Sequence, residues 1–325
     1  MRRKEGLIFA NARAKSKENG LMNEERLHRI MESKTVSDAM RVLAEMNYAG
    51  GMTPEGEDFY SLLKEEERLA TAFVLEAAPK GIGFECFFMR NDYHNAKVLL
   101  KAKFGKLTDL TDMIMPDGNM TFSELKRRIE EGKTDFDPFL DGAIKKIDRL
   151  FAEGKGSPRL IDVELDKAMY DNVNSCLPSC DECIRTYFRA QADLINIESY
   201  VRTLCIRAGF SFFESNFLAG GTLDKKRFEE CKGEKEKLVK MLSGSVYKPF
   251  VEKLEEGLVS YETARDDFLL KIISKDKADM FTVAPILGYY LAKCNEVRIL
   301  RVVLVSIKNK IEPEEMKKRV RALYA

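Results

Sequence analysis

The 325-residue chain contains no tryptophan, nine prolines and only two histidines, His28 and His94. A histidine-based zinc site or catalytic site would have to use one of these two, and neither lies in a recognisable motif. Lysine and arginine number 54 against 53 aspartates and glutamates, which gives a net charge of +1. A dedicated nucleic-acid binder usually carries a strongly basic domain, so this balance argues against that class.

Long apolar runs are also missing. The densest, residues 299–307, is interrupted by Arg301 and Ser306, whereas a membrane-spanning helix needs roughly 20 apolar residues. The basic N-terminus is not followed by the apolar segment of a signal peptide, so we expect a cytoplasmic protein. The seven cysteines are an odd number in a chain with no export signal, and we expect reduced thiols rather than a disulfide framework.

Motifs for nucleotide binding and for hydrolysis are absent as well. The chain contains no Gly-x4-Gly-Lys-Ser/Thr phosphate loop and no Gly-x-Ser-x-Gly nucleophile turn. Paired acids such as Asp266 and Asp267 lie in helical patterns and are expected at solvated helix positions. We therefore predict that the chain has no catalytic residue, no cofactor and no metal ligand.

The chain does contain extensive helical patterning and few alternating strands, which predicts an all-α fold. Apolar residues recur at helical spacing, bounded by caps and breakers, in residues 57–78, 121–132, 159–173, 181–209, 223–242 and 249–274. A terminal helix is predicted over residues 314–323, entered through Pro313. Residues 297–305 are rich in β-branched side chains and suit a strand as well as a helix.

An internal repeat of about 100 residues accompanies this patterning. The pair Asp92-x-x-Asn95 recurs 101 residues later as Asp193-x-x-Asn196, and Glu296 follows 103 residues after Asp193. Each of these acids has a proline upstream, at a distance of 13, 15 and 11 residues in turn. The repeat predicts that similar helical units are arranged in succession along the chain.

The segments that follow the two aspartates extend the correspondence, because Thr121 and Thr222 each lie 29 residues after their aspartate. A unit with an exposed apolar helix face buries that face against its neighbours. Three such units would close into a body with pseudo-threefold symmetry. The predicted units, within a single protein spanning residues 1–325, are 50–150, 151–248, and 249–325 together with the N-terminal helix in 1–49.

Cys176, Cys180 and Cys183 form a C-x3-C-x2-C motif, the spacing by which radical SAM enzymes hold three irons of a 4Fe–4S cluster. That fold needs strands alternating with helices, and the sequence shows no such pattern. Positions i, i+4 and i+7 share one helix face, so burial as small apolar residues is the structural alternative. A metal- or Fe–S-binding enzyme that uses this triad is the rival function, although zinc would require a fourth ligand.

Residues 91–104 combine acid, amide and lysine side chains with an otherwise apolar pattern. Asp92 and Asn95 are expected near a helix start, where an acid and an amide satisfy free backbone N–H groups. Lys97 and Lys101 lie one helical turn apart and are expected along one edge of the helix. The histidine of this segment is expected on the helix surface.

The segment RNDYHNAKVLLKAKF, residues 90–104, resembles the Asp-x-x-Asn-x-Lys motif of the AC39 family, which comprises the C and d subunits of V-type ATPases. FANARAKSKENGLM resembles the N-terminal helix of this family, IDVELDKAMYDNV resembles its acidic helix ending in Tyr170, and DLINIESYVRTL repeats the motif. Residues 284–324 are similar to the C-terminal segment of the family, with Glu296 and Arg301 at matching positions. Cys294 stands where an acid is common and Ile299 where asparagine is expected, and the cysteine triad is no part of the pattern.

The resemblance implies a funnel-shaped, all-helical, non-catalytic subunit in the central stalk of a rotary V/A-type ATPase or ATP synthase. Such a subunit is a socket that links the rotor shaft to the membrane proteolipid ring. It couples ATP hydrolysis or synthesis to proton or sodium transport. Its implied partners are the D- and F-type stalk subunits and the proteolipid ring, at the cytoplasmic face of the membrane, with no nucleic acid involved.

The resemblance also selects the candidate site residues, which are expected either to hold the fold together or to face a partner. The structural role is favoured. The candidates are Asp92, Asn95, Lys97, Lys101, Asp193, Asn196, Glu296 and Arg301.

Overall fold

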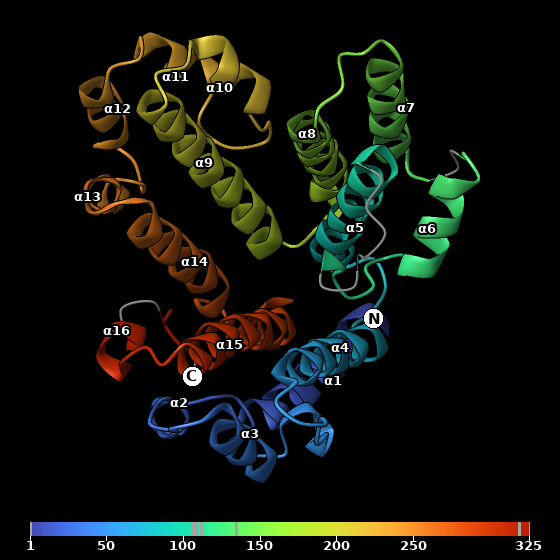
Figure 1. Ribbon diagram of the computed structural model, residues 1–325, viewed down its shortest axis with the longest axis vertical. Coiled ribbons are helices and arrows are strands. Elements are labelled where there is room, and N and C mark those ends of the chain that lie inside the picture. The colour runs from blue at the N-terminus through green and yellow to red at the C-terminus, as the bar shows by residue number, and fades with distance from the viewer. Residues whose placement is uncertain (1, 106–109, 111–112, 134–135, 318–319, 325) are drawn as a thin grey trace. The chain divides into compact units, whose positions relative to one another are not determined.

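The structure is a computed structural model that describes residues 2–105, 110, 113–133, 136–317 and 320–324. Within these ranges the chain forms helices joined by turns and loops, and no strand occurs (Figure 1). The predicted all-α class is therefore confirmed. No helix among the described residues is both long and apolar enough to cross a membrane.

The chain divides into two compact parts. The terminal part combines Met1–Lys80 with Asp266–Ala325, and the middle part is Gly81–Arg265. Helix α14 (Leu258–Ser274) runs through the boundary between them.

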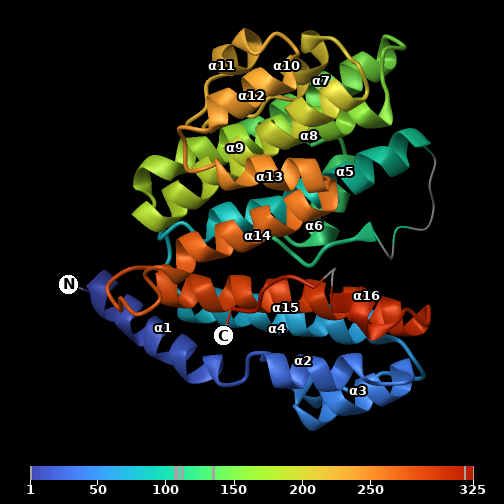
Figure 2. The same cartoon turned by 90° about the vertical axis from the view of Figure 1, so that its left-hand side faces the viewer.

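In the terminal part, α4 and α15 lie side by side and form the centre of the packing, as Figures 1 and 2 show. Their contacting residues, together with those of α2, α3 and η1, build one apolar cluster that includes Leu43, Phe59, Leu300 and Leu304. The helices of this part are α1 (Arg2–Glu18), α2 (Glu24–Met31), α3 (Val36–Glu45), the 3-10 helix η1 (Tyr48–Gly51), α4 (Phe59–Ala77), α15 (Ala284–Lys308) and α16 (Pro313–Lys317).

Helix α15 resolves the ambiguity of residues 297–305, which are helical throughout. Val297, Leu300, Val303 and Leu304 are buried at helical spacing against the cluster just described. Burial of a helical stripe outweighs the modest strand preference of β-branched residues, because that preference depends on packing context.

In the middle part, α5 and α7 both pack against α8 (Figure 1). A second cluster surrounds α9, where Tyr200 lies at a ring-centroid distance of 5.2 Å from Phe213 and 5.5 Å from Phe228. The helices of this part are α5 (Glu85–Gly105), α6 (Phe122–Glu130), α7 (Pro138–Ala152), α8 (Pro158–Cys176), the 3-10 helix η3 (Leu177–Ser179), α9 (Glu182–Cys205), α10 (Phe210–Asn216), α11 (Lys225–Glu230), α12 (Lys235–Leu242) and α13 (Pro249–Glu256).

The helices predicted over residues 57–78, 121–132, 159–173 and 181–209 are confirmed as α4, α6, α8 and α9, within a few residues at their ends. Residues 223–242 and 249–274 are each broken into two helices, so those single-helix predictions were wrong. Gly233 and Gly257 stand in the breaks with φ of 77° and 121°. These values lie outside the right-handed helical region, and glycine adopts them at little cost.

The predicted terminal helix over residues 314–323 is shorter than expected. Helix α16 ends at Lys317, and residues 320–323 are not helical. Residues 318–319 lie outside the described part of the chain.

Candidate functional site

The first candidate pair, Asp92 and Asn95, lies in the middle of α5 and is buried. The prediction that these residues mark a helix start was wrong, since α5 begins at Glu85. The Asp92 carboxylate accepts hydrogen bonds from the backbone N–H groups of Asn119 and Met120, at 2.9 and 3.1 Å. Asn95 exchanges two hydrogen bonds with the backbone of Met115, at 2.9 and 3.1 Å. The two side chains thus hold the loop of residues 115–120, which leads into α6.

The second pair, Asp193 and Asn196, performs the same task from the middle of α9, where both residues are fully buried. Asn196 exchanges two hydrogen bonds of 2.8 Å with the backbone of Leu218. The Asp193 carboxylate accepts from the backbone N–H groups of Thr222 and Leu223, at 2.9 and 2.8 Å. These contacts hold the loop of residues 218–223, which leads into α11.

We call each buried acid with the loop it holds a loop anchor. The two anchors have the same spacing. In each, the asparagine binds the backbone of one loop residue, and the acid binds the backbone N–H groups of the residues four and five positions after it. A glycine precedes the acid-bound residues in each, at 118 and 221. A Cβ atom at these glycines would lie 2.4 and 2.1 Å from the carboxylate oxygen of Asp92 and of Asp193, so only glycine lets the loop approach the acid this closely.

This geometry corrects the expected correspondence between Thr121 and Thr222. Thr222 binds Asp193, whereas Thr121 is the N-cap residue of α6 and accepts from the N–H of Glu124. The residues bound by the asparagines lie 20 and 22 positions downstream of them. The second loop is therefore two residues longer, and equal spacing from the aspartates aligns positions that are not equivalent.

Glu296 on α15 forms a third anchor within the terminal part. Its Oε2 atom accepts a hydrogen bond of 2.8 Å from the backbone N–H of Met22, just before α2. Met22 lies two positions after Gly20. Met120 and Leu223 likewise lie two positions after Gly118 and Gly221. The residues after these three, Asn23, Thr121 and Asp224, are the N-cap residues of α2, α6 and α11.

The sequence therefore carries a second repeat that the acid spacing alone did not reveal. Its pattern is glycine, any residue, Met or Leu, an N-cap residue, three further residues and a large apolar residue. The apolar residues Leu27, Leu125 and Phe228 are all buried. Searching for glycine followed by a cap residue three positions later would have found all three loops.

Glu296 differs from the two aspartates because a buried cation lies beside it. Lys293 Nζ lies 2.9 Å from Glu296 Oε1 and 2.7 Å from Glu66 Oε1. The second carboxylate oxygen of Glu66 accepts from the backbone N–H of Ala49 at 2.7 Å. Burial raises the pKa of Glu296 in spite of the nearby lysine. Burial alone would lower the pKa of Lys293, but the two carboxylates outweigh this effect and raise it.

Asp92 shows the energetic cost of an anchor without a cation. Burial raises the pKa of Asp92 to about 6, against the lowering effect of the hydrogen bonds from Asn119 and Met120. Desolvation penalises the charged form of a carboxyl, and hydrogen bonds to the carboxylate compensate only partly. The anchor on α5 is therefore held by an acid whose pKa is about 6.

The remaining predicted residues take different positions. Lys97 and Lys101 on α5 pair with Asp166 and Asp162 on α8, at 2.5 and 2.6 Å. These two ion pairs join neighbouring helices inside the middle part. Arg301 is exposed on α15. Whether any of these side chains faces a partner stays a prediction.

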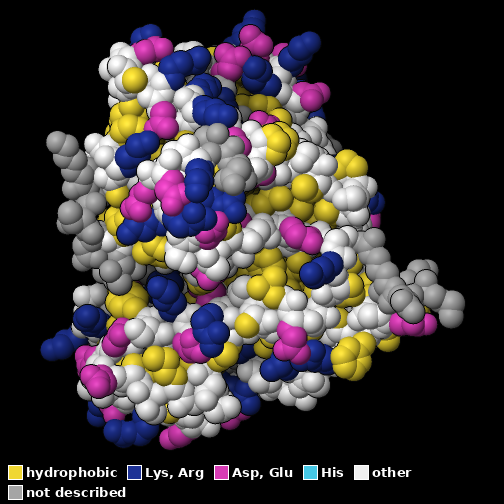
Figure 3. Space-filling model, turned by 90° about the vertical axis from the view of Figure 1, so that its right-hand side faces the viewer, with side chains coloured by type: hydrophobic (Ala, Val, Ile, Leu, Met, Phe, Trp, Pro, Cys, Tyr) yellow, Lys and Arg dark blue, Asp and Glu magenta, His cyan; other side chains and the backbone are white. Residues whose placement is uncertain are grey.

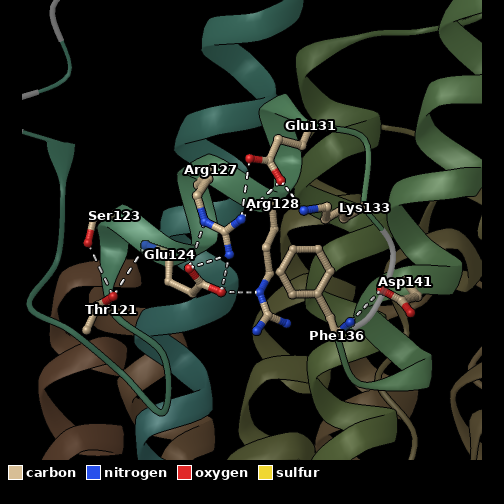
Figure 4. Close-up of polar contacts among 9 residues, drawn as sticks. All are labelled: Thr121, Ser123, Glu124, Arg127, Arg128, Glu131, Lys133, Phe136 and Asp141. Atoms are coloured by element: carbon tan, nitrogen blue, oxygen red, sulfur yellow. Dashed lines mark hydrogen bonds and ion pairs between the residues drawn. The ribbon is translucent and has the colours of Figure 1, made fainter.

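The surface of α6, beyond the first anchor, carries a local charge network (Figure 4). Arg127 pairs with Glu124 at 2.8 Å and with Glu131 at 3.1 Å, and Arg128 pairs with Glu124 at 2.6 Å. Arg128 also lies over the ring of Phe136, 5.6 Å from its centroid. These three pairs join residues three or four positions apart, and their side chains are exposed or partly exposed. Water and salt screen such pairs, so the network adds little to stability.

The histidines and the cysteine triad belong to no metal-holding group among the described residues. His94 is half-buried, its Nε2 atom lies 2.9 Å from the carbonyl oxygen of Met113, and burial lowers its pKa. Cys180 and Cys183 are buried and Cys176 is partly exposed. Over the described residues, no group of three or more His, Cys, Asp or Glu side chains could hold a metal ion. The rival metal-enzyme function therefore gains no support.

On the face shown in Figure 3, lysine and arginine are interspersed with aspartate and glutamate rather than gathered into a patch of one sign. This mixture agrees with the balanced charge count of the whole chain. It offers no continuous basic stripe of the kind that nucleic-acid binders use.

Comparison with known proteins gives a match over nearly the whole chain. Residues 10–319 match the family model described as ATP synthase (C/AC39) subunit. The C subunit of the V-type sodium ATPase of Enterococcus hirae is 24% identical over 279 residues, covering 82% of this chain and 83% of that protein. The C subunit of the A-type ATP synthase of Pyrococcus horikoshii is 24% identical over 343 residues, covering 96% of this chain and 89% of that protein. The corresponding protein of Desulfurococcus sp. is 24% identical over 331 residues, covering 95% and 89%.

Proposed function

The chain belongs to the ATP synthase (C/AC39) subunit family, and we propose that it is a non-catalytic central-stalk subunit of a rotary V/A-type ATPase. The observation that carries this proposal is the match over residues 10–319, which includes all three loop anchors. The relatives named above are the C subunits of a V-type sodium ATPase and of A-type ATP synthases.

In this proposal the protein is a socket between the rotor shaft and the membrane proteolipid ring. Its partners are D- and F-type stalk subunits on one side and the ring on the other, at the cytoplasmic face of the membrane. It transmits torque and so couples ATP hydrolysis or synthesis to proton or sodium transport. Closely packed helices supply the stiffness that torque transmission requires.

We also propose that the chain is built as a funnel of three similar units: 50–150, 151–248, and 249–325 with 1–49. The three anchors support this division, because their glycines at 20, 118 and 221 recur after 98 and 103 residues. In the third anchor the acid comes from the C-terminal segment and the loop from the N-terminal segment. This pairing explains why the last unit needs both ends of the chain.

The candidate residues then have an intramolecular role. Asp92, Asn95, Asp193, Asn196 and Glu296 hold loops within the chain through buried hydrogen bonds. A side chain that is buried and bonded on both carboxylate oxygens has little capacity left for a partner. We propose that partners contact the surfaces that the anchors shape and not the anchors themselves.

Affinity purification from the native host tests the function. A tagged chain is extracted in mild detergent, and the co-purifying proteins are identified by mass spectrometry, with an untagged strain as control. We expect stalk subunits, the proteolipid and the nucleotide-binding subunits together. Recovery of the chain alone, in a host that assembles the ATPase, would contradict the proposal.

A further inference from the structure

Two cysteines that the loop anchors do not use lie against each other in the middle part. The sulfur atoms of Cys86 and Cys180 are 3.9 Å apart, although the residues are 94 positions apart in sequence. Cys86 lies in the first turn of α5, and Cys180 directly follows η3. Both side chains are buried, with exposed fractions of 2% and 6%. A disulfide requires a sulfur–sulfur distance of about 2.05 Å, so the sulfurs need to approach by about 2 Å, within the reach of side-chain rotation.

The backbone next to this pair leaves room for the sulfur of Cys180. Gly83 has a φ of 102°, and a Cβ atom there would lie 2.8 Å from Cys180 Sγ and 2.8 Å from Ile184 Cδ1. A larger residue at position 83 would therefore push Cys180 out of place. Gly83 permits the close approach of two chain segments at the point where the two thiols meet.

The other cysteines of the C-x3-C-x2-C motif are arranged differently. Cys176 is partly exposed and its carbonyl oxygen accepts a hydrogen bond of 3.3 Å from Cys180 Sγ, while Cys183 is buried on the first turn of α9. The sulfur of Cys180 lies 3.9 Å from that of Cys86, which belongs to a distant segment. The motif thus contributes one partner of a two-cysteine pair whose other member, Cys86, lies outside it.

We propose that Cys86 and Cys180 form a reversible disulfide when the protein meets a low-molecular-weight disulfide. The thiolate of Cys180 attacks one sulfur of the reagent, forms a mixed disulfide and releases one thiolate. The thiolate of Cys86 then attacks the Cys180 sulfur, closes the protein disulfide and releases the second thiolate. The two protons lost by the cysteines end on the two released thiols, so two protein thiols are oxidised and one reagent disulfide is reduced.

The reaction is expected to be slow and to accelerate as the pH rises. Burial raises the pKa of both Cys86 and Cys180, so little thiolate is present at neutral pH. Entry of the reagent requires local opening at the turn of η3, which also limits the rate. The pair therefore responds to sustained oxidising conditions and not to brief ones, and a dithiol reductant reverses it.

The disulfide would bind the first turn of α5 to the turn between α8 and α9. Closing a loop of this length restricts the unfolded chain strongly. We expect oxidation to raise the melting temperature of the purified protein by on the order of 5 °C. This effect does not depend on any rotary complex, so the test is separate from that of the proposed function.

The test incubates the purified full-length chain with glutathione disulfide or with dithiothreitol, alkylates the remaining thiols, and digests the protein without reduction. Mass spectrometry is expected to find one peptide pair linked through Cys86 and Cys180, lighter by two hydrogen atoms than the separate peptides. The link should be absent from Cys86→Ser and retained in Cys205→Ser, a matched variant at an exposed cysteine. No link in the wild-type protein, or a link from Cys180 to Cys176 or Cys183 instead, would overturn the proposal.

Discussion

The anchors on α9 and on α15 hold equivalent loops by different chemistry. Asp193 accepts four hydrogen bonds from described residues, all from neutral donors: two backbone N–H groups, the hydroxyl of Thr222 at 2.6 Å and the hydroxyl of Tyr247 at 2.6 Å. Glu296 receives one backbone N–H group, and its other oxygen pairs with the buried ammonium of Lys293. A buried carboxylate can thus be stabilised either by several neutral donors or by one cation.

Among the described residues, the anchor on α5 has neither the extra hydroxyl donors nor a cation. Burial raises the pKa of Asp92 to about 6, although hydrogen bonds from the backbone of Asn119 and Met120 and from the Asn119 side chain lower it. The loop geometry is therefore repeated along the chain, while the groups that stabilise the buried acid differ between the anchors. Substitutions at the three anchors should therefore change the free energy of unfolding by different amounts and with different pH dependence.

The largest effect is expected from removing the buried cation. Lys293→Met leaves the carboxylates of Glu66 and Glu296 buried without a cation. We expect a loss of about 3–5 kcal/mol in the free energy of unfolding, measured in urea. Lys317→Met is the matched control, because Lys317 and Glu314 form an exposed pair at the same three-residue spacing. The control should change stability by less than about 0.5 kcal/mol. Equal effects of the two variants would refute the role of Lys293.

The next largest effects are expected at the two aspartate anchors, where the loss of stability should differ. Asp193→Ala removes the acceptor of four hydrogen bonds and should cost about 4 kcal/mol. Asp92→Ala removes the acceptor of two backbone hydrogen bonds and should cost about 2 kcal/mol. The smaller cost at Asp92 also reflects the desolvation that its removal relieves. Urea unfolding of both variants at neutral pH measures the difference. A larger loss for Asp92→Ala would show that counting donors is the wrong basis for the comparison.

Stability should depend on pH through Asp92 in a direction set by its raised pKa. The folded state binds the Asp92 proton more tightly than the unfolded state, so this contribution is present below about pH 4 and is lost as the pH rises to about 6. Relative to Asp92→Asn, the wild-type protein should lose about 3 kcal/mol over that interval. Parallel curves of unfolding free energy against pH for the two proteins would contradict the assignment.

The smallest effect is expected at Tyr247. Tyr247→Phe removes one of the four donors to Asp193 and should cost about 1–2 kcal/mol. In the Asp193→Ala background the same substitution should have almost no effect, because the hydrogen bond is already absent. A double-mutant cycle measures this coupling. Additive effects would mean that the hydroxyl of Tyr247 stabilises something other than Asp193.

Helical periodicity predicted most of the fold because helices such as α4 and α8 carry clear apolar stripes and caps. It could not locate the breaks at Gly233 and Gly257, since an isolated glycine is tolerated inside helical patterns. Asp92 and Asn95 were misplaced at a helix start for a related reason. A polar pair in a helix looks like a cap when the loop that it binds lies 20 or more residues away.

The cysteine motif shows a different limit. Its spacing was interpreted as one face of a single helix, but Cys176 ends α8, Cys180 follows η3 and Cys183 lies on α9. The sulfur of Cys180 instead lies 3.9 Å from that of Cys86. Spacing along the chain does not determine contact between segments, which depends on tertiary packing. The repeat of acids was visible in the sequence because it is spaced along the chain, whereas the thiol pair became visible only in the structure.

The family-motif acids hold loops inside the chain, and amide hydrogen exchange of the purified protein tests this role most directly. We expect the amides that bond to the anchors to be protected in the wild-type protein, namely Met115, Asn119 and Met120 in the first loop and Leu218, Thr222 and Leu223 in the second. Asp92→Ala should remove the protection of the first loop only, and Asp193→Ala that of the second loop only. If both loops kept their protection in both variants, the acids would not be anchors.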